Sequence, residues 1–336
     1  MTAKLAIVGP STRPDADVDY TYGIVPPGLG RVVFTSNCGN ISAAVGPFAI
    51  DSAMVPVHEP VTAVRIHNTN TGKVLVAQVP VRNGKARVEG PFPIPGVPGT
   101  GAEILMDYRH TVGAKTSRGM PTGHAVDRIV LADGRSFEVS LCDVGNPCVF
   151  IEASALGLTG SELPTEIDAD QAALQTMREI RGRAAAMLGF CADWSLAEAE
   201  SPALPLVVVV AKPAGYRDAN GDAVAAEDAD LRARLIFYNR CHESMAGTGS
   251  MCTAAAASVE GTLVHRVAQR GADGLLRIGH PLGVMSVSVA PEGGLLRPDT
   301  PLQFDRLGFS RTARRLMQGI AYVPHPPAAP ASKEYP

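Results

Sequence analysis

The sequence has few aromatic residues, no excess of positive charge and no apolar run long enough for a membrane helix. Aromatic residues make up only 5% of the 336, with a single tryptophan, and the formal net charge is −3. Because lysines and arginines are scattered, the basic surface of a nucleic-acid-binding protein is missing, and we expect no nucleic-acid partner. The longest apolar run, residues 203–211 (ALPLVVVVA), is too short to span a bilayer and is typical of a buried strand. We therefore expect no membrane partner.

The beginning of the sequence does not resemble an export signal, since the apolar residues 5–8 (LAIV) are far fewer than a signal peptide contains. We therefore expect a cytoplasmic protein whose six cysteines are reduced. No two cysteines form a CxxC pair, which argues against a zinc site, so no metal is expected. Five cysteines are expected to be small, buried apolar side chains: Cys142, Cys148, Cys191, Cys241 and Cys252.

The chain is long enough for two domains, and its 34 glycines and 27 prolines predict many short elements. Apolar and polar residues alternate between Gly/Pro/Asn clusters, which predicts two series of strands. The first lies at 4–9, 31–35, 62–69, 73–81 and 84–90, and the second at 126–131, 136–144, 148–154, 205–211 and 233–238. A short helix is expected at 42–54 and an amphipathic packing helix at 168–188. Residues 91–103 and 109–125 are interpreted as a linker, and 326–336 as a disordered tail.

Two short segments of the chain resemble each other. Residues 39–44 (GNISAA) and 249–257 (GSMCTAAAA) would each start a buried helix behind a glycine-rich loop, 36–40 (SNCGN) and 246–250 (AGTGS). Unpaired N–H groups and the helix dipole favour anions at such a terminus, so two facing loops would suit a substrate with several carboxylates. The alternative is that both loops are ordinary N-caps and turns.

Cys38 lies at the mouth of the first loop, in residues 35–51 (TSNCGNISAAVGPFAID). A helix N-terminus would stabilise its thiolate, and a thiol that ionises near neutral pH is suited to general acid or base catalysis. The alternative is a cysteine that only packs, as most free cysteines do. Composition leaves both interpretations open.

Longer motifs resemble the PrpF family of isomerases, which has the diaminopimelate-epimerase-like fold. They are residues 4–25, 36–51 (SNCGNISAAVGPFAID), 121–127, 144–164, 247–257, 279–283 and 313–324, in family order over nearly the whole chain. The resemblance implies two pseudo-symmetric α/β halves, each a curved mixed sheet around a central helix, with the substrate between them. The halves would be residues 1–118 and 119–303, the first completed by about 304–325. The family includes 2-methylaconitate isomerases and 4-oxalomesaconate tautomerases, which move a proton between allylic carbons without a metal or an organic cofactor.

The resemblance also assigns roles to residues. Lys4 and Cys38 are implied as the catalytic pair, and partial burial near other cations would lower the pKa of Lys4 enough for it to act as a base. The residues expected to bind the substrate carboxylates are Gly39, Asn40, Ser42, Asn146, Gly247, Thr248, Gly249 and Ser250. His110, Lys115, Arg118 and His280 are either further carboxylate partners or, more often for such groups, exposed surface residues.

We therefore expect a 1,3-allylic isomerase of a small unsaturated polycarboxylate. The overall resemblance of the sequence slightly favours a substrate of the 4-oxalomesaconate type. One alternative is an epimerase or racemase, against which Ala246 stands where a second thiol would be needed. Another is an inactive paralogue that only binds polycarboxylates. The first motif has far less chain ahead of it than the second, so we expect the first half to lack several strands. Such a half would expose a sheet edge and apolar surface, and a homodimer is one way to cover them.

Overall fold

The computed structural model describes residues 3–26, 30–34 and 37–322 of the chain. These residues form a mixed sheet of 15 strands, in which some neighbouring strands are parallel and others antiparallel. The strands follow, in spatial order, with β5 and β16 as short side branches of β4 and β15: β1 (Ala3–Pro10), β2 (Val18–Val25), β3 (Val61–Asn68), β4 (Lys73–Arg82), β5 (Lys85–Ala86), β8 (Ile104–Asp107), β19 (Phe304–Arg311), β18 (Gly283–Pro291), β17 (Leu275–His280), β15 (Leu231–Phe237), β16 (Arg240–Cys241), β12 (Leu206–Ala211), β11 (Asn146–Glu152), β10 (Ser136–Val144) and β9 (Asp127–Val130).

Two small hairpins and six α-helices complete the described part of the fold. The hairpins are β6 (Phe92–Ile94) with β7 (Val97–Gly101), and β13 (Tyr216–Arg217) with β14 (Ala223–Val224). The helices are α1 (Gly39–Asp51), α2 (Pro164–Ala169), α3 (Gln171–Met187), α4 (Ala197–Glu200), α5 (Gly247–Ala257) and α6 (Leu263–Val267). Short 3₁₀ turns lie at Arg109–Thr111, Ala153–Leu156, Trp194–Leu196 and Ala226–Asp228.

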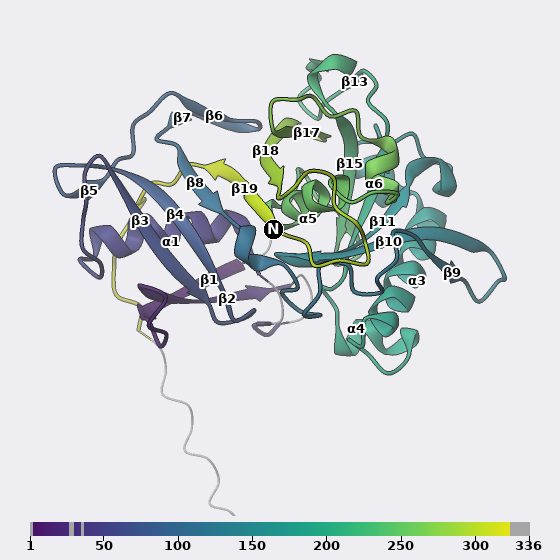
Figure 1. The fold of residues 1–336 in the computed structure, drawn as a ribbon, viewed down its shortest axis with the longest axis horizontal. Helices are drawn as coiled ribbons and strands as arrows, with labels where there is room; N and C mark the ends of the chain where they lie inside the picture. The colour runs from purple at the N-terminus through teal and green to yellow at the C-terminus, as the bar shows by residue number, and fades with distance from the viewer. Residues whose placement is uncertain (1–2, 27–29, 35–36, 323–336) are drawn as a thin grey trace, which may run out of the picture.

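Helices α1 and α5 are the two central helices of the molecule (Figure 1). Helix α1 packs against β1–β5 and β8, whereas α5 packs against β10, β11, β18 and β19, and the two helices touch each other. Strand β19 connects the two groups of strands, because it pairs with β8 on one side and with β18 on the other. The C-terminal strand therefore fixes how the two central helices face each other.

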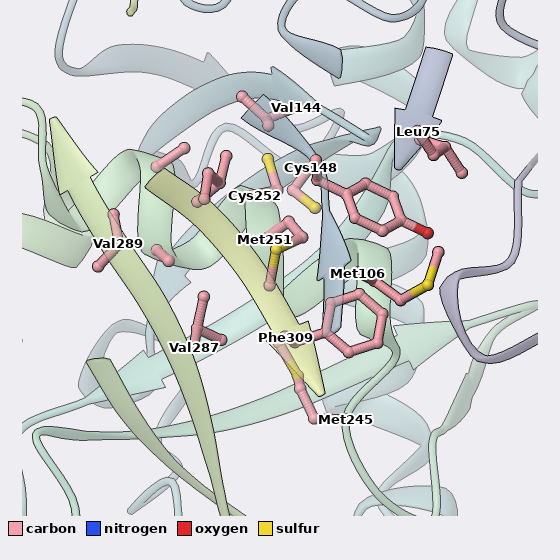
Figure 2. Packing of buried hydrophobic residues seen from close by; sticks show 14 of the residues in the cluster. Leu75, Met106, Val144, Cys148, Met245, Met251, Cys252, Val287, Val289 and Phe309 are labelled. Atoms are coloured by element: carbon pink, nitrogen blue, oxygen red, sulfur yellow. The ribbon is translucent and has the colours of Figure 1, made fainter. Parts of the chain in front are cut away.

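The largest apolar core is continuous across both groups of strands. Figure 2 shows its centre, where Phe309 of β19 lies among Met106 of β8, Met245 just before α5, Met251 of α5, and valines of β18. The five cysteines predicted to be buried are buried, which confirms that prediction. A second core lies between α3 and strands β9–β12.

Most predicted strands are confirmed, but three expectations are wrong. Of the described residues 31–34 only Val33 pairs, in a single bridge to Ile24, while residue 35 lies outside the described residues; 84–90 contributes only the two residues of β5. The predicted linker at 91–103 instead contains β6 and β7, and β8 follows it directly. Strands β2, β17, β18 and β19 were not predicted as strands. The division into halves at residue 118 stays a prediction, and the tail at 326–336 lies outside the described residues.

The first strand, β1, lies at one end of the sheet order, and among the described residues it pairs only with β2. Its Leu5 and Ile7 are 43% and 51% exposed, and Phe48 of α1 is 47% exposed. The expectation of an exposed sheet edge in this part of the molecule is thus confirmed.

Within the described ranges, no helix has both the length and the apolarity needed to cross a membrane.

Candidate active site

The predicted catalytic pair is brought together by the fold. Lys4 lies on β1 and Cys38 is the N-cap of α1, and the Lys4 Nζ atom is 3.9 Å from the Cys38 Sγ atom. Both residues line a cavity between the N-termini of α1 and α5. Cys38 is half-buried, whereas Lys4 is exposed, so the expected partial burial of the lysine is wrong.

The N-termini of α1 and α5 both open into this cavity. Their N-cap residues, Cys38 and Ala246, have extended backbones and make no side-chain capping hydrogen bond. The first N–H groups of each helix are therefore free of the capping partner that usually satisfies them, and Gly39, Asn40, Gly247 and Thr248 line the cavity beside them. Uncapped helix N-termini favour a bound anion, and here two of them face the same space.

Two glycines allow the helix N-termini to approach this closely. A Cβ atom on Gly39 would lie 2.9 Å from the Phe309 ring and 3.1 Å from the backbone nitrogen of Thr248. A Cβ atom on Gly247 would lie only 2.6 Å from the same ring. Both positions need glycine for this close approach, and the ring of Phe309 is the surface on which the two loops rest.

Asn146 joins the two loops through a buried hydrogen-bond network. Its Nδ2 group donates to the Asn37 carbonyl at 2.9 Å and to the Thr248 hydroxyl at 2.9 Å, while its Oδ1 atom accepts from the Asn37 N–H at 3.3 Å. Asn68 donates to the Asn37 side chain as well. The Asn146 side chain is therefore fully engaged, and it positions the loops rather than offering a free donor to a ligand.

The cavity also contains residues that the sequence analysis did not single out. His242 lines it beside Tyr22, and burial together with the positive charge of Lys4 lowers the pKa of His242 to about 4. The Nδ1 atom of His242 accepts a hydrogen bond from the Ser244 N–H, so the neutral ring carries its proton on Nε2. The Tyr22 hydroxyl lies against Cys38, and burial raises the pKa of this phenol, which keeps it a hydrogen-bond donor.

Three predicted binding residues lie outside the lining of this cavity. The Ser42 hydroxyl bonds to the Gly39 carbonyl and to Tyr108, and the Ser250 hydroxyl bonds to the Gly247 carbonyl. Gly249 packs against Leu235. These three residues therefore stabilise the first turns of the two helices and do not line the cavity.

The four further cations named from the sequence are also absent from this lining. The Lys115 ammonium donates to the Asn70 carbonyl, and burial lowers the pKa of Lys115. His280 is only 3% exposed, so its interpretation as a surface group is wrong. It lines an adjoining cavity together with Asn40 and Arg311.

The sequence model of the PrpF protein family matches residues 1–324. The chain belongs to the PrpF family. A 3-methylitaconate isomerase from Eubacterium barkeri is 44% identical over 326 residues, 96% of this chain and 83% of the relative. A 2-methyl-aconitate isomerase from Cupriavidus necator is 34% identical over 96% of this chain and 82% of the relative. A 4-oxalomesaconate tautomerase from Pseudomonas putida is 32% identical, over 96% of this chain and 81% of the relative.

Solved structures agree with this assignment. The crystal structure of a methylitaconate-delta-isomerase has a TM-score of 0.82 at 44% identity, covering 94% of this chain and 80% of that one. A probable proline racemase from Agrobacterium radiobacter has a TM-score of 0.52 at 17% identity, covering 97% and 78%, and shows the fold alone. The predicted diaminopimelate-epimerase-like α/β fold is confirmed.

The comparisons change two of the sequence-based expectations about the PrpF chain. The expectation that several strands are missing is not supported, since the family match spans residues 1–324 and the relatives align with 96% of this chain. The lean towards the 4-oxalomesaconate type is not supported either. Identity to the tautomerase is 32%, whereas identity to the 3-methylitaconate isomerase is 44%.

Proposed function

We propose that this chain is an isomerase that moves a proton between the two ends of an allylic system in a small unsaturated dicarboxylate of the 3-methylitaconate type. The observation that carries the proposal is the 3.9 Å separation of the Lys4 amine and the Cys38 thiol at a cavity with two uncapped helix N-termini. A proton-transfer pair and an anion site are thus combined, and this enzyme class requires both.

The proposed reaction needs no atom from outside the substrate apart from an exchanged proton. One member of the pair removes the proton from carbon 3 of 3-methylitaconate, the carbon next to the carbon 4 carboxylate. The C–H electron pair becomes delocalised over carbon 3, that carboxylate and the methylene carbon. A proton returned to the methylene carbon converts it into a methyl group and leaves the double bond between carbons 2 and 3. The product is a 2,3-dimethylbutenedioate.

The helix N-termini supply the electrostatic part of the proposal. Negative charge grows on the carbon 4 carboxylate as the proton leaves, and the first residues of both helices, Gly39–Asn40 and Gly247–Thr248, line the cavity beside Cys38. Preorganised hydrogen-bond donors at the position where charge develops commonly contribute about 3 kcal/mol each to transition-state stabilisation. The neutral His242 and the Tyr22 phenol add donors at the same cavity. The free thiol that the mechanism needs is compatible with a reducing, cytoplasmic location.

An epimerase or racemase is less well supported. Those reactions use one proton-transfer group on each face of a single carbon, and the second loop offers only Ala246 at the N-cap of α5. Cys252, which lies within α5 itself, is fully buried in the core and donates to the Cys142 carbonyl. It is therefore not available to a ligand.

The test is the isomerisation of 3-methylitaconate, followed by ultraviolet absorbance as the double bond becomes conjugated with both carboxylates. Wild type should turn over, whereas Cys38→Ser and Lys4→Met should each lose at least about 100-fold in kcat. Lys85→Met is the matched control, because Lys85 is an exposed lysine that bonds only to the Asp51 carbonyl. A folded wild-type protein that turns over neither this compound nor 2-methylaconitate or 4-oxalomesaconate would refute the proposal.

A further inference from the structure

A second cavity adjoins the candidate active site and contains an arginine without a counter-ion. Asn40 lines both cavities. Met245, Met285, His280 and Arg311 line the second cavity, and Met245 is followed in the chain by Ala246, which lines the first. The two cavities are therefore neighbours, with Asn40 in the lining of both.

The Arg311 guanidinium is fixed by its surroundings. Its Nε atom donates to the Asn40 side chain at 2.8 Å and its Nη1 atom donates to the Ser310 carbonyl at 2.8 Å. Its Nη2 atom lies 3.3 Å from the sulfur of Met285, and its carbon centre lies 4.5 Å from the centre of the Phe309 ring. A planar fork held in this way loses little entropy when it binds a carboxylate.

No carboxylate of the described residues neutralises this charge. The groups whose charges act on the pKa of Arg311 are Tyr108 and Cys38, and burial lowers that pKa to about 10, so the side chain remains a cation at neutral pH. Arg311 is half-buried, and a partly desolvated cation with a thioether, an amide and a carbonyl as its neighbours has not recovered its lost hydration. Such a site attracts an anion of matching shape.

His280 adds a neutral donor to the same cavity. It is 3% exposed, and its Nδ1 atom accepts from the Leu282 N–H at 3.1 Å, so the ring proton resides on Nε2. Burial and the charges of Arg234 and Arg311 lower the pKa of His280 to about 3. The cavity thus combines one fixed cation with one uncharged donor, the donor set that carboxylates commonly meet in proteins.

We propose that Arg311 is the specificity-determining residue of the site: it binds the carboxylate on carbon 1, remote from the carbon that loses its proton, and thereby selects dicarboxylates over monocarboxylates. This inference rests on the proposed function, in which the helix N-termini hold the carbon 4 carboxylate. Arg311 then contributes to substrate binding and orientation, whereas Lys4 and Cys38 perform the proton transfer. Asn40 positions Arg311 through its hydrogen bond to Nε.

The kinetic test compares 3-methylitaconate with its carbon 1 methyl ester. Wild type should favour the diacid by about 100-fold or more in kcat/KM, as expected when one partner of a buried charge pair is removed. Arg311→Met should lose that preference to within a few-fold, mainly through KM for the diacid, and Arg311→Lys should regain only part of it because it lacks the fork. Arg306→Met is the matched control, since Arg306 is an exposed arginine on the same strand.

A binding test keeps this inference separate from the proposed function. The probe is the saturated diacid methylsuccinate, compared with its monomethyl esters by isothermal titration calorimetry, which needs no turnover. Tighter binding of the diacid to wild type and to Arg306→Met, but not to a folded Arg311→Met, would support the subsite even if no substrate is isomerised. Equal binding of methylsuccinate to wild type and Arg311→Met, or a variant that loses kcat with KM unchanged, would overturn it.

Discussion

The close contact of the two helix N-termini predicts different outcomes for two similar glycine substitutions. In Gly247→Ala the three atoms nearest the new Cβ would all belong to the Phe309 ring, at 2.6 Å for Cζ, 3.1 Å for Cε2 and 3.2 Å for Cε1. In Gly39→Ala the new Cβ would meet that ring at 2.9 Å and also the backbone of the facing loop, at 3.1 Å from the Thr248 nitrogen. A side chain can be shortened by mutation, whereas the backbone of a helix N-terminus cannot move without displacing the site.

We expect each single substitution to cost about 1–3 kcal/mol of unfolding free energy, the usual range for overpacking a filled core. Adding Phe309→Leu removes the ring, so Gly247→Ala should recover by about 1 kcal/mol or more in a double-mutant cycle. Gly39→Ala should recover much less, because the contact with the Thr248 backbone remains. Both single variants should also lose about 100-fold in kcat/KM, the cost of shifting reacting groups by roughly 1 Å.

The assay is urea unfolding of wild type, the three single variants and the two double variants, with kcat/KM measured on the same preparations. Phe309→Leu alone supplies the baseline, since Phe309 is buried and its shortening has a cost of its own. If both cycles are additive, or if Phe309→Leu rescues the two glycine variants equally, the two loops do not meet as described.

The remaining predictions concern the hydrogen bonds, the charges and the thiols around the site. Asn146→Ala should cost about 1–3 kcal/mol in urea unfolding, because it leaves the Asn37 and Thr248 partners unpaired; unchanged stability would contradict the bridge. The pKa of His280 is lowered to about 3 from 6.5, so on acidification the unfolded chain takes up the proton before the folded chain does. The free energy of unfolding should therefore decrease as the pH is lowered, by about 2 kcal/mol from pH 7.5 to pH 5. His280→Gln should show a flatter pH dependence, and an unchanged slope would refute this. Iodoacetamide should modify Cys38 ahead of the five buried thiols and inactivate the enzyme, with methylsuccinate protecting; modification without inactivation would count against the site.

Alternation of apolar and polar residues predicted β3 and β4 well, because each has one more deeply buried face that the sequence pattern records. The same signal was present in β2, where Val18, Tyr20 and other alternate residues are buried, and it was overlooked. Strand β7 could not be predicted in this way, since its residues Val97–Gly101 include two glycines and a proline and are mostly exposed. Its pairing with β6 depends on the hairpin turn rather than on a buried face.

The catalytic pair was implied by the family resemblance, and the helix N-termini were visible as glycine-rich loops. Arg311 was not predicted, because its hydrogen bond to Asn40 joins residues 271 positions apart in the sequence. No local sequence pattern can indicate such a contact. His242 was missed for the same reason, as nothing in its neighbourhood resembles a motif. The roles expected of Ser42 and Ser250 rest on their place near the two loops. Each serine is the fourth residue of its helix, and its hydroxyl donates to the carbonyl of the first residue instead.

The central claim, that Lys4 and Cys38 carry a proton between the ends of an allylic system, is tested most directly by following the reaction in deuterium oxide by proton NMR. We predict that wild type converts 3-methylitaconate into a product with solvent deuterium in its new methyl group. Lys4→Met and Cys38→Ser should abolish this labelling, whereas Lys85→Met should retain it. Labelling and turnover within about tenfold of wild type in either pair variant would contradict the account.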